Sequence, residues 1–371
     1  MFALPALSAL QLLPLPLAIL ELLSPLRAEA VAAAVQFGGS PMSSLSVAPE
    51  STLNFLLLSV ILCAVFCTTR SLAACAGRDP WRLLAPLVVL ALAEGLLGLS
   101  QAQPGAFEAG VAGSFVNRNH YAAFLCCIPP LVLARLFGHC AAAHGRGVSI
   151  GVLAAACLLI GAAALHSMSR TGLVALAVSA VWMAGLLVPR RAIAIPSLLV
   201  TPIGFALLAP PELVSRLLSG DTAGRLDFWR ETLRLIHHYP LSGCGLGAFE
   251  LAIYPWRESA PALLLDYAHN DFLQLAAETG VLGLPVILCG VVLIVRLSIR
   301  RVPAAVPNHD RFLVAGCGAA LLSFCVFGMF DSNLRVPVNA VTASWILGVL
   351  AGMESTSRYR PAKIGARAQS V

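Results

Sequence analysis

The chain consists of long apolar stretches separated by short polar ones. Ten stretches are long enough, or nearly so, to cross a bilayer as helices, which takes about 20 apolar residues. Their approximate ranges are 3–24, 53–69, 83–100, 120–137, 148–166, 171–188, 192–209, 279–298, 312–330 and 336–353. The pattern predicts an all-α fold, a polytopic membrane bundle of about ten transmembrane helices with one long polar loop, 210–268.

Composition supports a membrane protein. Of the 371 residues, 58% are hydrophobic and 11% are charged, whereas a soluble domain carries about 25% charged residues. We therefore expect membrane lipids to surround the chain, and we expect no nucleic acid among its partners.

The placement of Arg and Lys orients the helices. Fifteen of these residues flank one set of helix ends, and four lie in the short loops at the other ends, when the five in the 210–268 loop are set aside. Positive residues concentrate on the cytoplasmic side. Both termini are therefore expected in the cytoplasm, and the 210–268 loop outside.

The first apolar segment, 3–24, permits two interpretations. It lacks a positive N-terminal region, contains several prolines, and is followed by Arg27-Ala28-Glu29-Ala30, which faintly resembles a cleavage site. A cleaved signal peptide therefore remains open. The length of the apolar stretch favours an uncleaved helix.

Metal and disulfide chemistry find little support in the sequence. The eleven cysteines show no metal-ligand spacing and no disulfide framework, and no Asp-x-Asp pair occurs. We expect the cysteines to act as small hydrophobic residues and expect neither a metal nor a cofactor.

Polar clusters stand out at the predicted outer helix ends. Asn117, Arg118, Asn119 and His120 precede the fourth helix, where Asn119 could serve as N-cap, but the cluster could equally face a substrate. Arg170 lies at the mouth of two apolar helices, either reaching the interface or binding an external anion.

Two further positions on this side are also ambiguous. Glu94 could be functional or could merely reach the interface. A polar segment at 331–335 lies on the same side and joins these candidates.

The long loop contains a predicted helix at 224–238, with Asp221 or Thr222 as its cap. Arg225 falls in its first turn, where the helix dipole favours anions. Arg225 either binds a phosphate together with the N-terminus of this helix or is a simple surface arginine. The glycines of 242–247 indicate a flexible turn more than a phosphate loop.

The stretch HNDFLQLAAETGVLG, 269–283, closes the loop. His269 precedes a predicted helix on which Asn270, Gln274 and Glu278 recur every four residues, with Asp271 beside them. This polar stripe must face protein or water rather than lipid. Asn270, Asp271 and Glu278 either support the histidine or serve in capping and packing.

Several strings carry a family resemblance. GSFVNRNHYAAFL, SRTGL, GRLDFWRETLRLIHHYPLSGCGLGAFE and AHNDFLQLAAETGVLG, in this order between about 105 and 300, resemble the O-antigen ligase and polymerase family. The resemblance implies a metal-independent enzyme similar to glycosyltransferase-C proteins, in a bacterial inner membrane. Its site would face the periplasm.

The implied reaction moves a glycan from an undecaprenyl-diphosphate carrier to an acceptor hydroxyl. The acceptor would be lipid A-core, another lipid-linked glycan or a protein. By motif, His269 corresponds to the general base, and Arg170 and Arg225 to the diphosphate-binding arginines. Histidine suits base catalysis near neutral pH, and arginine forks match phosphate oxygens.

The resemblance also suggests a division of the chain. N-terminal transmembrane helices occupy 1–104, a ligase-like core 105–300, C-terminal transmembrane helices 301–353 and a cytoplasmic tail 354–371. A lipid-linked-glycan transporter and an envelope scaffold are the competing functions, although a transporter more often places its polar residues at the membrane midplane.

Overall fold

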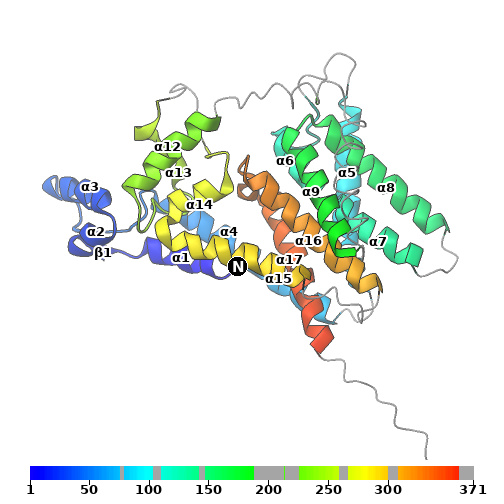
Figure 1. The fold of residues 1–371 in the computed structure, drawn as a ribbon. Coiled ribbons are helices and arrows are strands. Elements are labelled where there is room, and N and C mark those ends of the chain that lie inside the picture. The colour runs from blue at the N-terminus through cyan, green and yellow to red at the C-terminus, as the bar shows by residue number, and fades with distance from the viewer. Residues whose placement is uncertain are drawn as a thin grey trace, which may run out of the picture.

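The computed structural model describes residues 1–75, 79–102, 110–141, 147–187, 213, 225–258, 266–299 and 308–358, which are almost entirely helical (Figure 1). The α-helices are α1 (Ala3–Leu12), α2 (Leu17–Leu23), α3 (Pro25–Gln36), α4 (Pro49–Cys75), α5 (Ala85–Ser100), α6 (Arg118–Cys126), α7 (Pro129–Ala141), α8 (Gly147–His166), α9 (Arg170–Leu187), α12 (Arg225–His238), α13 (Phe249–Ile253), α14 (Asp271–Thr279), α15 (Leu284–Ile299), α16 (Asn308–Gly328) and α17 (Pro337–Arg358). Short 3-10 turns are η1 (Pro80–Leu83), η2 (Tyr254–Trp256), η3 (Gly280–Gly283) and η4 (Asn333–Arg335). Two short strands, β1 (Leu15–Pro16) and β2 (Met42–Ser43), pair antiparallel.

The predicted all-α, multi-pass membrane protein is confirmed. Within the described residues six helical segments are long and apolar enough to cross a bilayer: Pro49–Cys75, Arg118–Cys140, Gly147–His166, Arg170–Leu187, Asp271–Ile299 and Arg311–Gly328. Ala3–Leu12, Ala85–Ser100 and Pro337–Met353 are shorter apolar helices. The predicted span 192–209 lies outside the described residues, so the total of about ten stays a prediction.

The prediction of a single helix at 3–24 is wrong. The chain forms α1 and α2 instead, separated by extended backbone that includes β1. Pro14 and Pro16 cause the break, because proline has no N–H to donate and its ring clashes with the preceding helical turn.

Helix α1 is nevertheless tied into the fold. The buried Gln11 side chain donates to the carbonyl oxygens of Ser242 and Glu278, each at 2.8 Å, and accepts from the Leu246 N–H at 2.9 Å. One side chain from the start of the chain thereby satisfies two backbone groups of the loop between α12 and α13 and one of α14.

The predicted N-cap of the fourth membrane segment is also corrected. Asn117, not Asn119, caps α6, because its side-chain oxygen accepts the Asn119 N–H at 2.8 Å. Helix α6 ends at Cys126, and α7 begins at Pro129, a residue that suits the first position of a helix. The predicted segment 120–137 is thus two consecutive helices.

Close packing of small residues joins α17 to α4. A Cβ at Gly352 would collide with the carbonyl oxygen of Arg70, and one at Gly348 with Phe66 and Thr69. Two glycines four residues apart on one face let helix backbones approach closely, as membrane helices commonly do. Helix α17 continues past the predicted end at 353 to Arg358.

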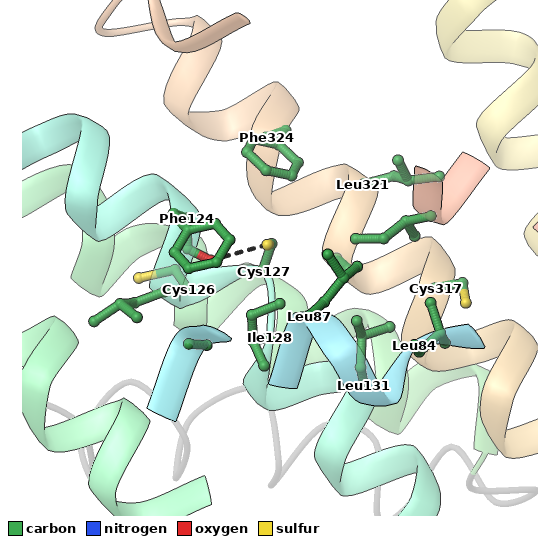
Figure 2. Packing of buried hydrophobic residues seen from close by; sticks show 14 of the residues in the cluster. Leu84, Leu87, Phe124, Cys126, Cys127, Ile128, Leu131, Cys317, Leu321 and Phe324 are labelled. Atoms are coloured by element: carbon green, nitrogen blue, oxygen red, sulfur yellow. Dashed lines mark hydrogen bonds between the residues drawn. The ribbon is translucent and has the colours of Figure 1, made fainter. Parts of the chain in front are cut away.

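The main apolar core is built largely from α5, α6, α7, α8, α9, α16 and α17, and Figure 2 shows the part that lies among α5, α6, α7 and α16. Phe124, Ile128 and Leu131 pack there against Leu321 and Phe324. All eleven cysteines are free thiols. Cys126, Cys127 and Cys317 are completely buried in this core, as expected of small hydrophobic residues.

Candidate active site

His269 precedes Asn270, the N-cap of α14, and has an unusual backbone conformation. Its φ is +49°, in the left-handed region that non-glycine residues rarely adopt. The surrounding contacts maintain this conformation. The Asn270 side-chain oxygen caps α14 by accepting the N–H groups of Phe272 and Leu273, both at 3.0 Å. Strained residues of this kind cluster at active sites.

The backbone on both sides of this histidine is also fixed. The Trp229 indole donates to the carbonyl oxygen of His269 at 3.4 Å, and the Ala268 N–H donates to Gln274 Oε1 at 3.1 Å. The Asn270 amide donates to the Met329 carbonyl oxygen at 3.0 Å, which holds the start of α14 against the end of α16. The imidazole is therefore presented from a rigid frame.

The His269 ring pairs with a buried carboxylate. Its Nδ1 lies 2.9 Å from Asp331 Oδ1, and the Asp331 side chain is only 3% exposed. Because an ionised carboxylate can only accept, Nδ1 must be the donor, which leaves Nε2 of a neutral imidazole free to take a proton. The pair joins residues 62 positions apart in the sequence.

Other polar groups converge on Asp331. Asn119 Nδ2 donates to its Oδ2 at 2.9 Å, and His120 Nε2 lies 3.9 Å from its Oδ1. Burial by itself raises the pKa of this carboxyl, but the imidazoles of His120 and His269 more than offset that effect and hold the pKa well below its usual range. At neutral pH Asp331 is therefore a negative charge beside both histidines.

A cavity of about 650 Å³ opens in front of this cluster. Asn117, His120, Tyr267 and His269 contribute polar groups to its wall. The apolar part of the wall includes Leu90, Phe115, Phe124, Val336 and Val338. The volume falls in the range of small-molecule sites, about 300–1,000 Å³, and the mixed lining suits a substrate with polar and apolar parts.

In the predicted polar stripe on α14, Asp271, Gln274 and Glu278 are buried and face the segment 331–335. Asp271 accepts the Leu334 N–H at 3.1 Å, and Gln274 accepts from the Ser332 hydroxyl at 3.1 Å. Glu278 pairs with Arg335. These contacts fix the segment that carries Asp331, so Asp271 and Glu278 act on the site through their neighbours and do not line the His269 cavity.

Arg225 is the first residue of α12, the helix that packs against His269. The Phe228 ring centroid is 6.0 Å from that of His269, and Trp229 bonds to the histidine backbone. Positions three and four residues apart share a helix face. Arg225 therefore lies on the face of α12 that is turned to the histidine.

Arg118 and Arg170 are the first residues of α6 and α9. These helices contact each other through Cys126 and Gly172, with 3.7 Å between Sγ and the carbonyl oxygen. The Val111 N–H also donates to the His166 carbonyl oxygen at 3.0 Å, which joins the segment before α6 to the turn before α9. All three candidate arginines thus begin helices, yet none of them is among the described residues that line the His269 cavity.

Sequence reasoning found the histidine but not its partners. Asp331 entered the prediction only as part of the polar segment 331–335, and His120 only as one member of the 117–120 cluster. Glu94 has a structural task, because it accepts from the Ser114 hydroxyl at 2.6 Å and the Ser114 N–H at 3.0 Å. The available signal was the position of Asp331, a carboxylate at the end of a membrane helix on the same side as the other polar clusters.

The described residues contain no group of three or more histidine, cysteine, aspartate or glutamate side chains that could hold a metal ion. The site as described consists of the His269 imidazole, the buried Asp331 carboxylate and the polar groups of Asn119 and His120.

Comparison with known families identifies the central part of the chain. Residues 155–288 match the family model described as O-antigen ligase. The comparison with curated proteins gives no match. The matched segment runs from within α8 into α15 and contains Arg170, Arg225 and His269, whereas His120 and Asp331 lie outside it. Over this segment the chain is similar to the O-antigen ligases, and the resemblance drawn from its motifs is confirmed.

Proposed function

We propose that the protein transfers a glycan from an undecaprenyl-diphosphate carrier to an acceptor hydroxyl at the periplasmic face of a bacterial inner membrane. The observation that carries the proposal is His269, which lines a 650 Å³ cavity and is paired with the buried Asp331. The O-antigen ligase match, which contains this histidine, supports an enzyme of glycosyltransferase type.

In the proposed reaction His269 Nε2 removes the proton from the acceptor hydroxyl. The acceptor oxygen attacks the anomeric carbon, and the bond from this carbon to the diphosphate oxygen breaks. The diphosphate leaves with the bonding electron pair, and attack from the opposite face inverts the anomeric centre. Asp331 keeps Nδ1 protonated and stabilises the imidazolium that forms.

The leaving diphosphate needs positive charge that is in place before the bond breaks. Arg170 and Arg225 are proposed for this role, because guanidinium groups pair bidentately with phosphate oxygens. Each also begins a helix, where backbone N–H groups and the dipole favour anions. Arg118, Asn117 and Asn119 complete the polar surface on the α6 side, with Asn119 acting through Asp331.

Purified full-length protein, a synthetic undecaprenyl-diphosphate glycan and candidate acceptors test the proposal. The expected result is glycosylated acceptor and free undecaprenyl diphosphate, detected by mass spectrometry, without an ion gradient or nucleotide. Movement of the donor across vesicle membranes without cleavage of the glycan–diphosphate bond would show a transporter instead.

The acceptor class follows from the glycan profile of a deletion strain. Loss of long glycans on lipid A-core indicates a ligase, and single-repeat products indicate a polymerase. Altered pilin or exopolysaccharide indicates another branch of the family.

A further inference from the structure

A second cavity, of about 290 Å³, adjoins the cavity at His269. We call it the α4 pocket and define it by Asn54, Phe55, Glu250, Asp266, Tyr267 and Arg335, which all line it. Asp266 and Tyr267 line both cavities and directly precede Ala268-His269 in the chain. A ligand in the α4 pocket is therefore separated from the histidine only by this short wall.

One face of α4 forms a side of the α4 pocket. Ser51, Asn54, Phe55 and Leu58 line it at three- and four-residue steps, the spacing of a single helix face. Asn54 is an exposed amide in an apolar helix, and within the described part of the chain it forms no hydrogen bond. Its two donors and its acceptor are thus available to a ligand.

The opposite side of the pocket is kept close to α4 by Gly247. Its φ is +81°, and a Cβ there would lie 2.7 Å from the Ser51 carbonyl oxygen. Any larger residue would push the loop that carries Phe249 and Glu250 away from the helix. The pocket therefore depends on a specific loop conformation.

The charges of the α4 pocket disfavour an anion. Glu250 and Asp266 are exposed carboxylates at its wall. Arg335 is already paired with the buried Glu278, and its guanidinium lies 4.7 Å from the centroid of the Phe55 ring. The pocket thus has three carboxylates, those of Glu250, Asp266 and Glu278, and one guanidinium. Its net negative charge would repel a phosphate. Hydroxyl groups, in contrast, can donate to free carboxylates.

The aromatic residues fit the same kind of ligand. Phe55 and Tyr267 offer apolar faces, and Tyr267 adds a hydroxyl. Burial, followed by the Asp266 carboxylate, raises the pKa of Tyr267, so the phenol keeps its proton and can donate a hydrogen bond. A cavity with aromatic faces, carboxylates and an amide suits a neutral sugar ring.

We propose that the α4 pocket binds a neutral sugar unit of the acceptor glycan and directs its hydroxyl past Tyr267 to His269. The acceptor is favoured over the donor, because the donor sugar that reacts is bonded to a diphosphate, which the carboxylates repel. The reaction part of this inference rests on the proposed function, whereas sugar binding itself can be measured without it.

The kinetic test compares Asn54→Leu and Glu250→Gln with the wild-type full-length protein, and each substrate is varied in turn. Loss of a hydrogen bond to a sugar hydroxyl should raise the acceptor KM about fivefold or more, with a change in donor KM below about twofold. Glu50→Gln, an exposed carboxylate at the start of α4 that does not line the pocket, is the matched control. A rise in donor KM alone, or unchanged KM values, would overturn the inference.

A binding measurement separates this inference from the proposed function. Saturation-transfer NMR with a mixture of neutral hexose and N-acetylhexosamine disaccharides should give signals with the wild type and with Glu50→Gln. The signals should weaken in Asn54→Leu and Glu250→Gln and should persist when inorganic phosphate is added. Such binding without glycan transfer would reject the proposed function alone; transfer with equal disaccharide signals in every variant would reject the sugar site alone.

Discussion

The polar end of the molecule and its apolar bundle are held together in different ways. At the polar end, side-chain hydrogen bonds join distant segments, such as Asn119 and His269 to Asp331. In the bundle, glycines and buried apolar residues fit closely, as Gly352 does against α4. The comparison suggests that substitutions at the polar end change activity with the fold intact, whereas substitutions in the bundle change the fold.

The largest expected effect is that of His269→Ala. Removal of a positioned general base should lower the transfer rate by about 10²–10⁴, with little change in the unfolding temperature. His237→Ala, an exposed histidine on α12, is the matched control and should transfer at the wild-type rate. If both variants lost activity equally, the special position of His269 would be refuted.

Arg170→Ala and Arg225→Ala should follow in size. Each should cost about 2.7–4 kcal/mol of transition-state stabilisation, as loss of a preorganised charge partner does. Rates with the lipid-diphosphate donor measure this loss. Arg230→Ala is the control on the same helix, because Arg230 is exposed and paired with Asp227 at 2.8 Å. Wild-type rates for Arg225→Ala would remove this arginine from the diphosphate site.

Gly352→Leu tests whether close packing of α4 against α17 stabilises the apolar bundle. The new side chain must displace α4 from α17, and overpacking typically destabilises by about 1–3 kcal/mol. The unfolding temperature in detergent should fall, and activity should fall only in proportion to the folded fraction. Gly290→Leu on α15, where the space around the glycine is open, is the control. Equal destabilisation of both variants would argue against close packing of α4 and α17.

The smallest predicted effect concerns pH. The pKa of Asp331 is lowered on folding, so the carboxylate stabilises the fold above its unfolded pKa of about 3.9 and loses this contribution as the pH falls below that value. The groups that face this carboxylate are His269 Nδ1 at 2.9 Å, the Asn119 amide at 2.9 Å and His120 Nε2 at 3.9 Å.

The stability difference between wild type and Asp331→Asn should therefore not shrink between about pH 7 and pH 5, and should decrease below about pH 4. Unfolding temperatures across this range measure it. A difference that vanished near pH 6 would mean that the Asp331 carboxyl takes up a proton there.

Local periodicity accounts for what the sequence could reveal. The helix expected at 224–238 is α12, Arg225–His238. The expected stripe is also present, because Asn270 caps α14 and Gln274 and Glu278 lie on one face of it. Both features depend on residues within a few helical turns of each other, and the spacing of such residues in the sequence predicts which of them share a helix face. The break at Pro14 and Pro16 was also local, but the apolar length of 3–24 concealed it.

Contacts between residues far apart in the sequence could not be predicted from local spacing. Two asparagines, Asn117 and Asn119, stand near the start of α6 and are chemically equivalent as caps. Only the position of Asp331 decides that Asn119 turns to the carboxylate instead. The pairing of Asp331 with His269 is likewise set by the place where the turn after α16 meets the start of α14, which no local pattern specifies.

The central claim is that His269 and Asp331 act as one unit, and a double-mutant cycle tests it most directly. Single-turnover glycan transfer is measured for the wild type, His269→Ala, Asp331→Asn and the double variant. Loss of the carboxylate alone should slow transfer about a hundredfold or more, and the double variant should be no slower than His269→Ala alone. Losses that multiply in the double variant, or a near-normal rate for His269→Ala, would contradict the account.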